Sequence, residues 1–346
     1  MSHRRLTSLR RSGGAALLVT ALAACGQNGG GDGTADQASK YYEGENVDLV
    51  VPYDPGGGYD VYARALAPYL GECLGAEVVV RNEPGAGSLL ATNATAAAGP
   101  DDRRIQILNS VGATSAQLAS AQGAQFDMAE FSVVGRLATA ADTVSVAVDG
   151  GFQSFQDVID AESPVRFAAT GPGSNEYIAA SVLSAIYGFP LEVITGFGGS
   201  GEARLAVVSG SADAHASTWD STLGAVTNGE VRAVVVATDE PVELLPDTPL
   251  VTEFEPGTEE GKGLLESLVA LETLGRGIVA PPGLPEERLT ELRTAFECAT
   301  GNQELNAQLD GQQRPLDVLS GEEYEALVAS VLDASPEFTE VVKDSF

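Results

Sequence analysis

The feature that most constrains this chain is a run of three glycines between a predicted strand and a predicted helix. Residues 47–51 (VDLVV) are apolar and rich in β-branched side chains, which favours a short buried strand. Gly56, Gly57 and Gly58 follow, and residues without Cβ let the backbone turn tightly and approach a ligand. From Val61 onward, apolar residues recur at helical spacing. Because the first amides of a helix lack intrahelical acceptors and the dipole there favours negative charge, this arrangement predicts an anion-binding site.

Two known phosphate-binding patterns are absent from this stretch. It contains neither G-x-x-x-x-G-K-[ST] nor G-x-G-x-x-G, so neither a P-loop nor a dinucleotide site is predicted. A tight strand-to-helix turn without a ligand remains the alternative. Three further stretches rich in glycine, serine or threonine precede predicted helices, at residues 110–115, 170–175 and 196–201. In open α/β sheets ligands bind beyond the carboxyl ends of the strands, and two of the four loops are expected in each domain.

The alternation of predicted strands and helices indicates an α/β fold with parallel-rich sheets. We expect a discontinuous domain I made of residues 45–142 and 277–346, and a domain II made of residues 143–276. The chain crosses between them in predicted strands near residues 143–148 and 278–280, which form a hinge of crossing strands. The charged stretch 257–263 is expected to be a loop.

The N-terminus has the pattern of a bacterial lipoprotein leader. Residues 1–24 combine a basic segment of four arginines with a short apolar run, which is typical of a signal peptide. The run ends in Leu-Ala-Ala-Cys, so we expect cleavage before Cys25 and lipid on its sulfur, at the outer face of the cell membrane. Residues 25–44 are expected to form a disordered tether. An ordinary secretory signal followed by a chance cysteine is the alternative.

The charge of the chain excludes one class of partner. The formal net charge is −30, so a nucleic acid would be repelled. A small carboxylate remains compatible with this charge, because local amides and helix ends can bind it while the surface charges are screened by salt.

Cysteine and histidine usage bears on redox state and catalysis. With Cys25 lipidated, Cys73 and Cys298 remain, and in an oxidising compartment they are expected to form a disulfide; two separate buried thiols are the alternative. His215 is the single histidine after the leader, and no G-x-S-x-G motif accompanies it. A secreted hydrolase would need His215 beside Ser217 or another serine. No metal-ligand spacing is present, so we expect no catalysis, no metal and no cofactor.

Two segments carry a family resemblance. The stretches V-P-Y-D-P-G-G-G-Y-D (residues 51–60) and V-V-V-R-N-E-P-G-A-G-S (residues 78–88) resemble the extracytoplasmic solute receptors of tripartite tricarboxylate transporters, the TctC or Bug family. The resemblance implies a two-domain periplasmic-binding-protein fold of the type II kind, without enzymatic activity. A di- or tricarboxylate or an aromatic acid would bind in the interdomain cleft, and a membrane permease would receive it from a monomeric receptor. A lipoprotein that senses the solute and presents it to a membrane signalling partner is the alternative.

The resemblance also implies a set of ligand-binding residues. They are Gly56, Gly57, Gly58, Tyr59, Asp60, Ser110, Gly112, Thr114, Thr170, Gly173, Ser174, Asn175, Gly198, Gly199, Ser217 and Thr218. The chain departs from the family where Phe-Asp-Asn is frequent, because residues 216–218 here are Ala-Ser-Thr. Without that acid a ligand ammonium group lacks a counterion, which disfavours aspartate or glutamate as the ligand. Tyr59, Tyr177 and Trp219 are candidates to flank a flatter or larger acid, with a core position as the alternative for Trp219.

Overall fold

A computed structural model of the chain describes residues 40–346. The predicted signal peptide, the predicted lipid site at Cys25 and most of the predicted tether lie outside the described residues. The tether was expected to reach residue 44, but the chain is already packed at Tyr42, whose side chain is 2% exposed. The main-chain amide of Tyr41 also donates to a carboxylate oxygen of Glu291 at 3.0 Å.

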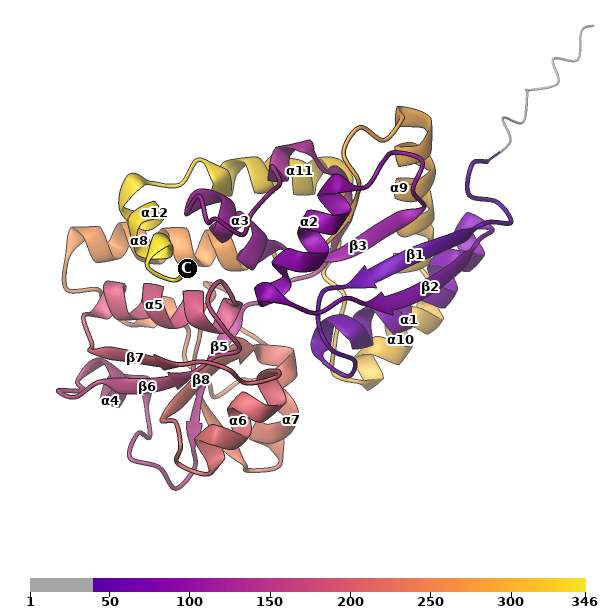
Figure 1. The fold of residues 1–346 in the computed structure, drawn as a ribbon. Helices are drawn as coiled ribbons and strands as arrows, with labels where there is room; N and C mark the ends of the chain where they lie inside the picture. Colours follow the sequence, from indigo (N-terminus) through magenta and orange to yellow (C-terminus); the bar gives the residue numbers. More distant parts are fainter. Residues whose placement is uncertain (1–39) are drawn as a thin grey trace, which may run out of the picture. The chain divides into compact units, whose positions relative to one another are not determined.

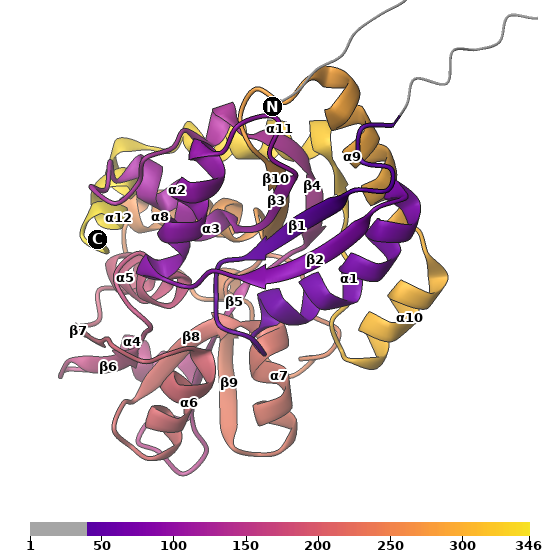
Figure 2. The same cartoon turned by 45° about the vertical axis from the view of Figure 1, so that its right-hand side comes forward.

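The first sheet has six strands in the order β11-β4-β10-β3-β1-β2. Its strands are β1 (Asn46–Val51), β2 (Glu77–Asn82), β3 (Arg104–Asn109), β4 (Ser132–Ala138), β10 (Arg276–Ala280) and β11 (Leu319–Ser320). β1 pairs in parallel with β2 and β3, whereas β10 runs antiparallel to β3 and β4. This sheet and the helices packed on it are called lobe I below (Figures 1 and 2).

The second sheet has five strands in the order β7-β6-β8-β5-β9. Its strands are β5 (Asp142–Ala147), β6 (Val165–Ala168), β7 (Leu191–Ile194), β8 (Ala214–Thr218) and β9 (Val231–Val236). β6 pairs in parallel with β7 and β8, whereas β5 runs antiparallel to β8 and β9. This sheet and its helices form lobe II (Figure 1). Both sheets are therefore mixed, and the antiparallel strands include β5 and β10, the predicted crossings between the lobes.

Twelve helices are described. They are α1 (Gly58–Leu74), α2 (Leu89–Ala97), α3 (Ser110–Leu118), α4 (Phe155–Ile159), α5 (Asn175–Tyr187), α6 (Ser200–Val208), α7 (Trp219–Thr227), α8 (Glu259–Glu272), α9 (Glu286–Thr300), α10 (Gln303–Gly311), α11 (Gly321–Leu332) and α12 (Pro336–Lys343). Helix α1 packs against α9 and β2. A disulfide between Cys73 of α1 and Cys298 of α9 links these two helices, with 6.1 Å between the Cα atoms.

Three local expectations differ from the structure. Residues 110–115 were expected to form a loop, but they lie in α3, because the Asn109 side chain caps the helix by accepting from the Gly112 amide at 3.1 Å. The expected loop 257–263 contains the start of α8, where the Thr258 hydroxyl accepts from the Gly261 amide at 2.9 Å. Helix α12 was not expected; Ser335 caps it, and a proline occupies its first position.

The two lobes share a buried apolar layer as well as the crossing strands. Helix α12 contacts α3, α5 and α8, and the side chains of Phe338 and Val342 on α12 are fully buried there. At the chain end, the Gly173 amide of lobe II donates to the Ser345 carbonyl at 2.9 Å. Figure 1 shows this C-terminal segment, in yellow, beside α5. The layer thus connects the lobes away from the glycine run.

Candidate ligand-binding cleft

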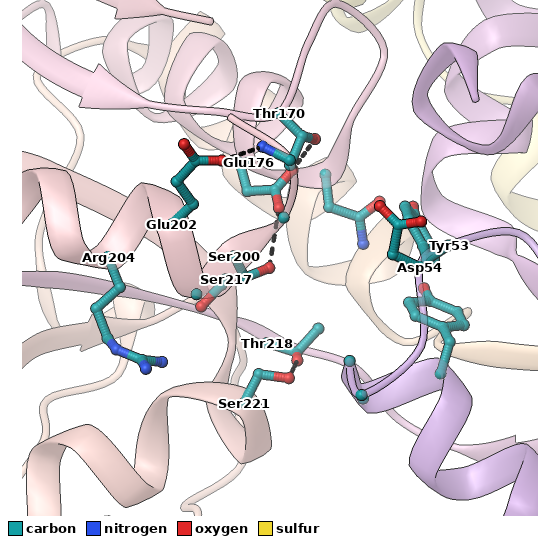
Figure 3. Close-up of a pocket in the computed structure, with 18 of the residues that line it drawn as sticks. Tyr53, Asp54, Thr170, Glu176, Ser200, Glu202, Arg204, Ser217, Thr218 and Ser221 are labelled. Atoms are coloured by element: carbon teal, nitrogen blue, oxygen red, sulfur yellow. Dashed lines mark hydrogen bonds between the residues drawn. The ribbon is translucent and has the colours of Figure 1, made fainter. Parts of the chain in front are cut away.

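A cleft of about 520 Å³ lies between the two lobes and includes the glycine run. This volume is in the range of small-molecule sites. We call it the interlobe cleft. The sequence-predicted residues that line it are Gly56, Gly57, Gly58, Tyr59, Thr170, Asn175, Gly198, Gly199, Ser217 and Thr218. Figure 3 shows residues from both lobes facing one another across it, with Tyr53 and Asp54 opposite Thr170, Glu176 and Ser200.

On the lobe I side, the cleft receives the N-terminus of α1. Gly57 occupies the N-cap position and no side chain caps the helix. Within residues 40–346, the main-chain amides of Gly58 and Tyr59 have no hydrogen-bond acceptor. Two donors at the positive end of a helix dipole are therefore available to a ligand anion.

Asp60 holds the glycine loop in place. Its carboxylate accepts from the Gly56 amide at 2.9 Å, from Arg64 Nε at 2.8 Å and from Asn82 Nδ2 at 2.9 Å. Asn82 also donates to the Tyr53 carbonyl at 2.9 Å. Burial opposes ionisation, but hydrogen bonds from Arg64, Asn82 and Gly56 keep the pKa of Asp60 below its ordinary value. Asp60 does not line the cleft; its hydrogen bonds fix the conformation of the glycine loop.

On the lobe II side, three helices begin at the cleft. Helix α5 starts at Asn175, α6 starts after Gly199, and α7 starts after Thr218. No side chain caps α6 or α7 at its first turn, and the Thr218 hydroxyl donates to Ser221 Oγ at 2.9 Å. Four helix N-termini from two lobes therefore converge on one cleft, which is the arrangement expected for an anion site.

Six sequence-predicted residues do not line the cleft. They are Asp60, Ser110, Gly112, Thr114, Gly173 and Ser174. Ser110 and Gly112 are buried within α3, where the Ser110 hydroxyl accepts from the Gly277 amide at 3.3 Å. Ser174 caps α5, accepting from the Tyr177 amide at 3.3 Å. A Cβ on Gly173 would come within 2.3 Å of the Phe346 ring, so this residue serves the packing of the chain end.

At the turn formed by residues 84–87 (P-G-A-G), the backbones of the two lobes lie close together. Gly87 has a φ of 62° and an added Cβ would lie 3.1 Å from the Pro172 carbonyl oxygen. Only a residue without a side chain fits both the left-handed backbone and this separation. The turn thereby positions lobe II loop residues 170–175 against lobe I.

Sequence reasoning missed a buried ion cluster at the cleft. The Arg276 side chain of β10 is 1% exposed and donates to Asp220 Oδ1 of α7 at 2.9 Å. Arg314, which follows α10, pairs with the other oxygen of the same carboxylate. Burial opposes ionisation of Asp220, but Arg276 and Arg314 hold its pKa below the ordinary value. The Arg276 guanidinium also lies over the Tyr59 ring, 5.1 Å from the centroid.

Two acidic residues of lobe II, Asp142 and Glu176, are also among the residues around the cleft, and the sequence analysis did not predict them. The Asp142 side chain at the start of β5 is buried, and within the described chain neither of its carboxylate oxygens has a hydrogen-bond partner. The Asp142 main-chain amide donates to Glu272 Oε2 at 3.0 Å. Burial, and next the charge of Glu272, raise the pKa of Asp142 well above its ordinary value, and burial raises the pKa of Glu272 to about 8. Glu176 accepts from the hydroxyls of Thr170 and Ser200, each at 3.2 Å.

The histidine is packed away from hydroxyl nucleophiles. His215 lies in β8 with its ring buried, and its Nδ1 is 2.8 Å from the Ala168 carbonyl oxygen. Burial lowers the pKa of this imidazole. Across residues 40–346, no serine hydroxyl hydrogen-bonds to the ring, and no group of three or more acids, cysteines or histidines is arranged to hold a metal ion. The arrangement is that of a binding site built from donors and paired charges.

This chain is similar to a known family of proteins. The model of the tripartite tricarboxylate transporter receptor family, TctC, matches residues 62–331. Among curated proteins, a UPF0065 protein from the ttuE-ttuC' intergenic region of Agrobacterium vitis is 27% identical over 221 residues, which is 63% of this chain and 63% of that protein. Within the described chain, no helix combines the length and apolar character needed to cross a bilayer.

Two solved structures share the fold. The periplasmic binding protein BugD superposes with a TM-score of 0.72 at 23% identity, covering 88% of this chain and 98% of that one. MatC of Rhodopseudomonas palustris, solved with bound malate, has a TM-score of 0.69 at 22% identity, with coverages of 87% and 98%. These likenesses establish the two-domain α/β fold of periplasmic binding proteins.

Proposed function

This chain belongs to the tripartite tricarboxylate transporter receptor family, TctC, and from that premise we propose that it captures a small organic carboxylate in the interlobe cleft and delivers it to the transporter's membrane permease. The family is one of periplasmic solute receptors and not of enzymes. The observation that carries the proposal is the convergence of four helix N-termini, from both lobes, on one cleft of about 520 Å³.

The hydrogen-bond donors around the cleft could account for micromolar affinity for a carboxylate. A hydrogen bond from a main-chain amide to a carboxylate contributes about 1.5–3 kcal/mol net. The two amides of α1 together with donors from lobe II could therefore support micromolar binding, about 8 kcal/mol, after ordering costs are subtracted. MatC, which has this fold, was solved with the dicarboxylate malate, which supports a ligand of similar size.

We propose that the ligand-contacting residues are those sequence-predicted positions that line the cleft. We also propose that lobe I corresponds to domain I (residues 45–142 and 277–346) and lobe II to domain II (residues 143–276), except that Asp142 begins β5 of lobe II and Arg276 begins β10 of lobe I. A ligand that contacts both domains stabilises the closed arrangement, because it makes its full set of contacts only there. We further propose that lipid on Cys25 anchors the receptor to the outer face of the cell membrane, where it works as a monomer near its permease. Serine in place of Cys25 should release the protein from the membrane fraction.

A thermal-shift screen tests the proposal. The purified chain is heated with di- and tricarboxylates, aromatic acids and amino acids at physiological salt, in the presence of a chelator. At least one acid should raise the melting temperature by several degrees, because binding to the native state alone stabilises it. If no carboxylate shifts the midpoint, the receptor function is wrong.

A further inference from the structure

One cluster of ionised side chains joins the two lobes at the interlobe cleft. Within residues 40–346, two salt bridges connect the lobes and both end on the Asp220 carboxylate of lobe II, whereas every other salt bridge there lies within a single lobe. Asp220 Oδ1 accepts from Arg276 of lobe I at 2.9 Å, and Oδ2 pairs with Arg314, also of lobe I. The complete cluster therefore exists only when the lobes lie close together.

The two arginines of the cluster are held in different ways. Arg276 begins β10, where the chain crosses between the lobes, and its Nη1 donates at 2.8 Å to the Thr139 carbonyl of the other crossing. Its Nη2 also donates to the Thr218 hydroxyl at 3.1 Å, and its side chain is 1% exposed. Arg314 follows α10, its side chain is 16% exposed, and within the described residues its guanidinium pairs with Asp220 alone. Arg276 is thus fixed beside the hinge, whereas Arg314 is held only by a residue of the opposite lobe.

We propose that Asp220 and Arg314 form an interlobe latch, an ion pair that stabilises the closed arrangement of the receptor both with and without ligand. Opening the cleft moves α7 of lobe II away from the segment after α10 of lobe I and breaks this pair. Opening also returns both charged groups to water. The latch therefore contributes the charge-assisted hydrogen bond less the desolvation of the two ions.

The interlobe latch lies beside the proposed site for the ligand carboxylate. A Cβ added to Gly58 would lie 3.2 Å from Arg276 Nη2 and 3.3 Å from Arg314 Nη1. The cluster contains two guanidinium groups and one carboxylate, so one positive charge is left unbalanced at the start of α1. A ligand carboxylate bound there reduces the repulsion between the two arginines and favours the closed arrangement. This coupling rests on the receptor function proposed above, whereas the latch itself does not.

Small-angle X-ray scattering of the purified chain without ligand tests the interlobe latch. Arg314→Met removes the guanidinium group and keeps an unbranched side chain, while Asp220 retains Arg276. The variant should have a larger radius of gyration than the parent, because fewer molecules are closed. Arg314→Lys restores a positive charge and should return the radius toward the parent value. Arg81→Met is the matched control, because it removes an arginine–aspartate pair inside lobe I, and it should leave the radius unchanged.

Titration calorimetry with malate, citrate and benzoate measures the coupling to ligand. Arg314→Met should weaken the binding of each acid that the parent binds about tenfold, because the closed arrangement loses a charge pair that spans the lobes. Arg81→Met should keep the parent affinity. At a saturating concentration of such an acid, the scattering of Arg314→Met should match that of the parent, because the ligand then closes both proteins.

The outcomes separate the latch from the receptor function. If ligand-free Arg314→Met has the same radius of gyration as the parent, the latch is wrong, even where binding is weaker, because Arg314 then acts on the ligand directly. A larger radius with unchanged affinity overturns the coupling. If none of the three acids binds the parent, the receptor function is contradicted for these acids, and the ligand-free scattering still decides on the latch. Circular dichroism confirms folding, and Arg314→Gln gives a second reading should Arg314→Met misfold.

Discussion

The substitution Gly58→Ala should weaken ligand binding at the start of α1 while the protein still folds. Gly58 is the first residue of α1, and alanine is favoured over glycine in a helix by about 0.5–1 kcal/mol. The backbone there lies outside the left-handed region, so Gly58→Ala introduces no backbone strain. The new Cβ must also displace Ser221 and the two arginine side chains near it, so we expect the variant to fold with a stability close to that of the parent.

Its effect on binding should be large. The new Cβ would lie 3.0 Å from Ser221 Oγ of lobe II and 3.2 Å and 3.3 Å from the guanidinium groups of Arg276 and Arg314. It would occupy the space in front of the α1 amides and push these neighbours away by a few tenths of an ångström. Loss of one charge-assisted hydrogen bond, about 1.5–3 kcal/mol, corresponds to roughly ten- to hundredfold weaker binding.

The assay is titration calorimetry with the acid that gives the largest thermal shift, alongside urea unfolding. Gly263→Ala is the matched control, because Gly263 lies within α8 with nothing near the position of an added Cβ. The control should gain about 0.5–1 kcal/mol of helix stability and keep the parent affinity. If Gly58→Ala binds as tightly as the parent, the anion does not bind at the start of α1 and the reasoning is refuted.

Three further perturbations test the buried charges and the disulfide. Because burial raises the pKa of Glu272 from 4.5 to about 8, the native state favours the protonated acid and stability falls as pH rises through this window. Between pH 6 and pH 9, the free energy of unfolding of Glu272→Gln, measured in urea, should therefore fall by about 3 kcal/mol less than that of the parent. Equal falls would contradict the raised pKa of Glu272. Asp220→Ala leaves the buried Arg276 without its carboxylate and should cost about 3–5 kcal/mol; a cost below about 1 kcal/mol would show that the pair is not buried in solution. Reducing the Cys73–Cys298 bridge, which joins residues 225 positions apart, should lower stability by about 5 kcal/mol in the chain-entropy account, and an unchanged unfolding midpoint in reductant would argue against the bridge.

The parts of the fold that sequence predicted are those encoded locally. The strand before Gly56 and the helix after Gly58 follow from adjacent residues, and both lie where they were expected. The crossings at β5 and β10 were likewise visible as short apolar runs in the right order. The segment 110–115 was misread because its composition suits a loop, whereas the capping side chain of Asn109 starts the helix directly at the strand end.

The charged residues of the cleft could not be found in the same way. Asp220 and Arg276 are separated by 56 positions and Asp220 and Arg314 by 94, so their pairing depends on how the lobes pack. Asp142 reads in the sequence as a polar residue before an apolar strand, and only the fold shows its carboxyl group buried at the cleft. No local pattern carries such information, because each group acquires its role from segments remote in the chain.

The most direct test of the central claim is a crystal structure with the tightest-binding carboxylate. The account predicts a ligand carboxylate oxygen about 3 Å from the main-chain amides of Gly58 and Tyr59, with the other end of the ligand contacting lobe II. A ligand bound outside the interlobe cleft, or held by side chains alone while these two amides face water, would contradict it.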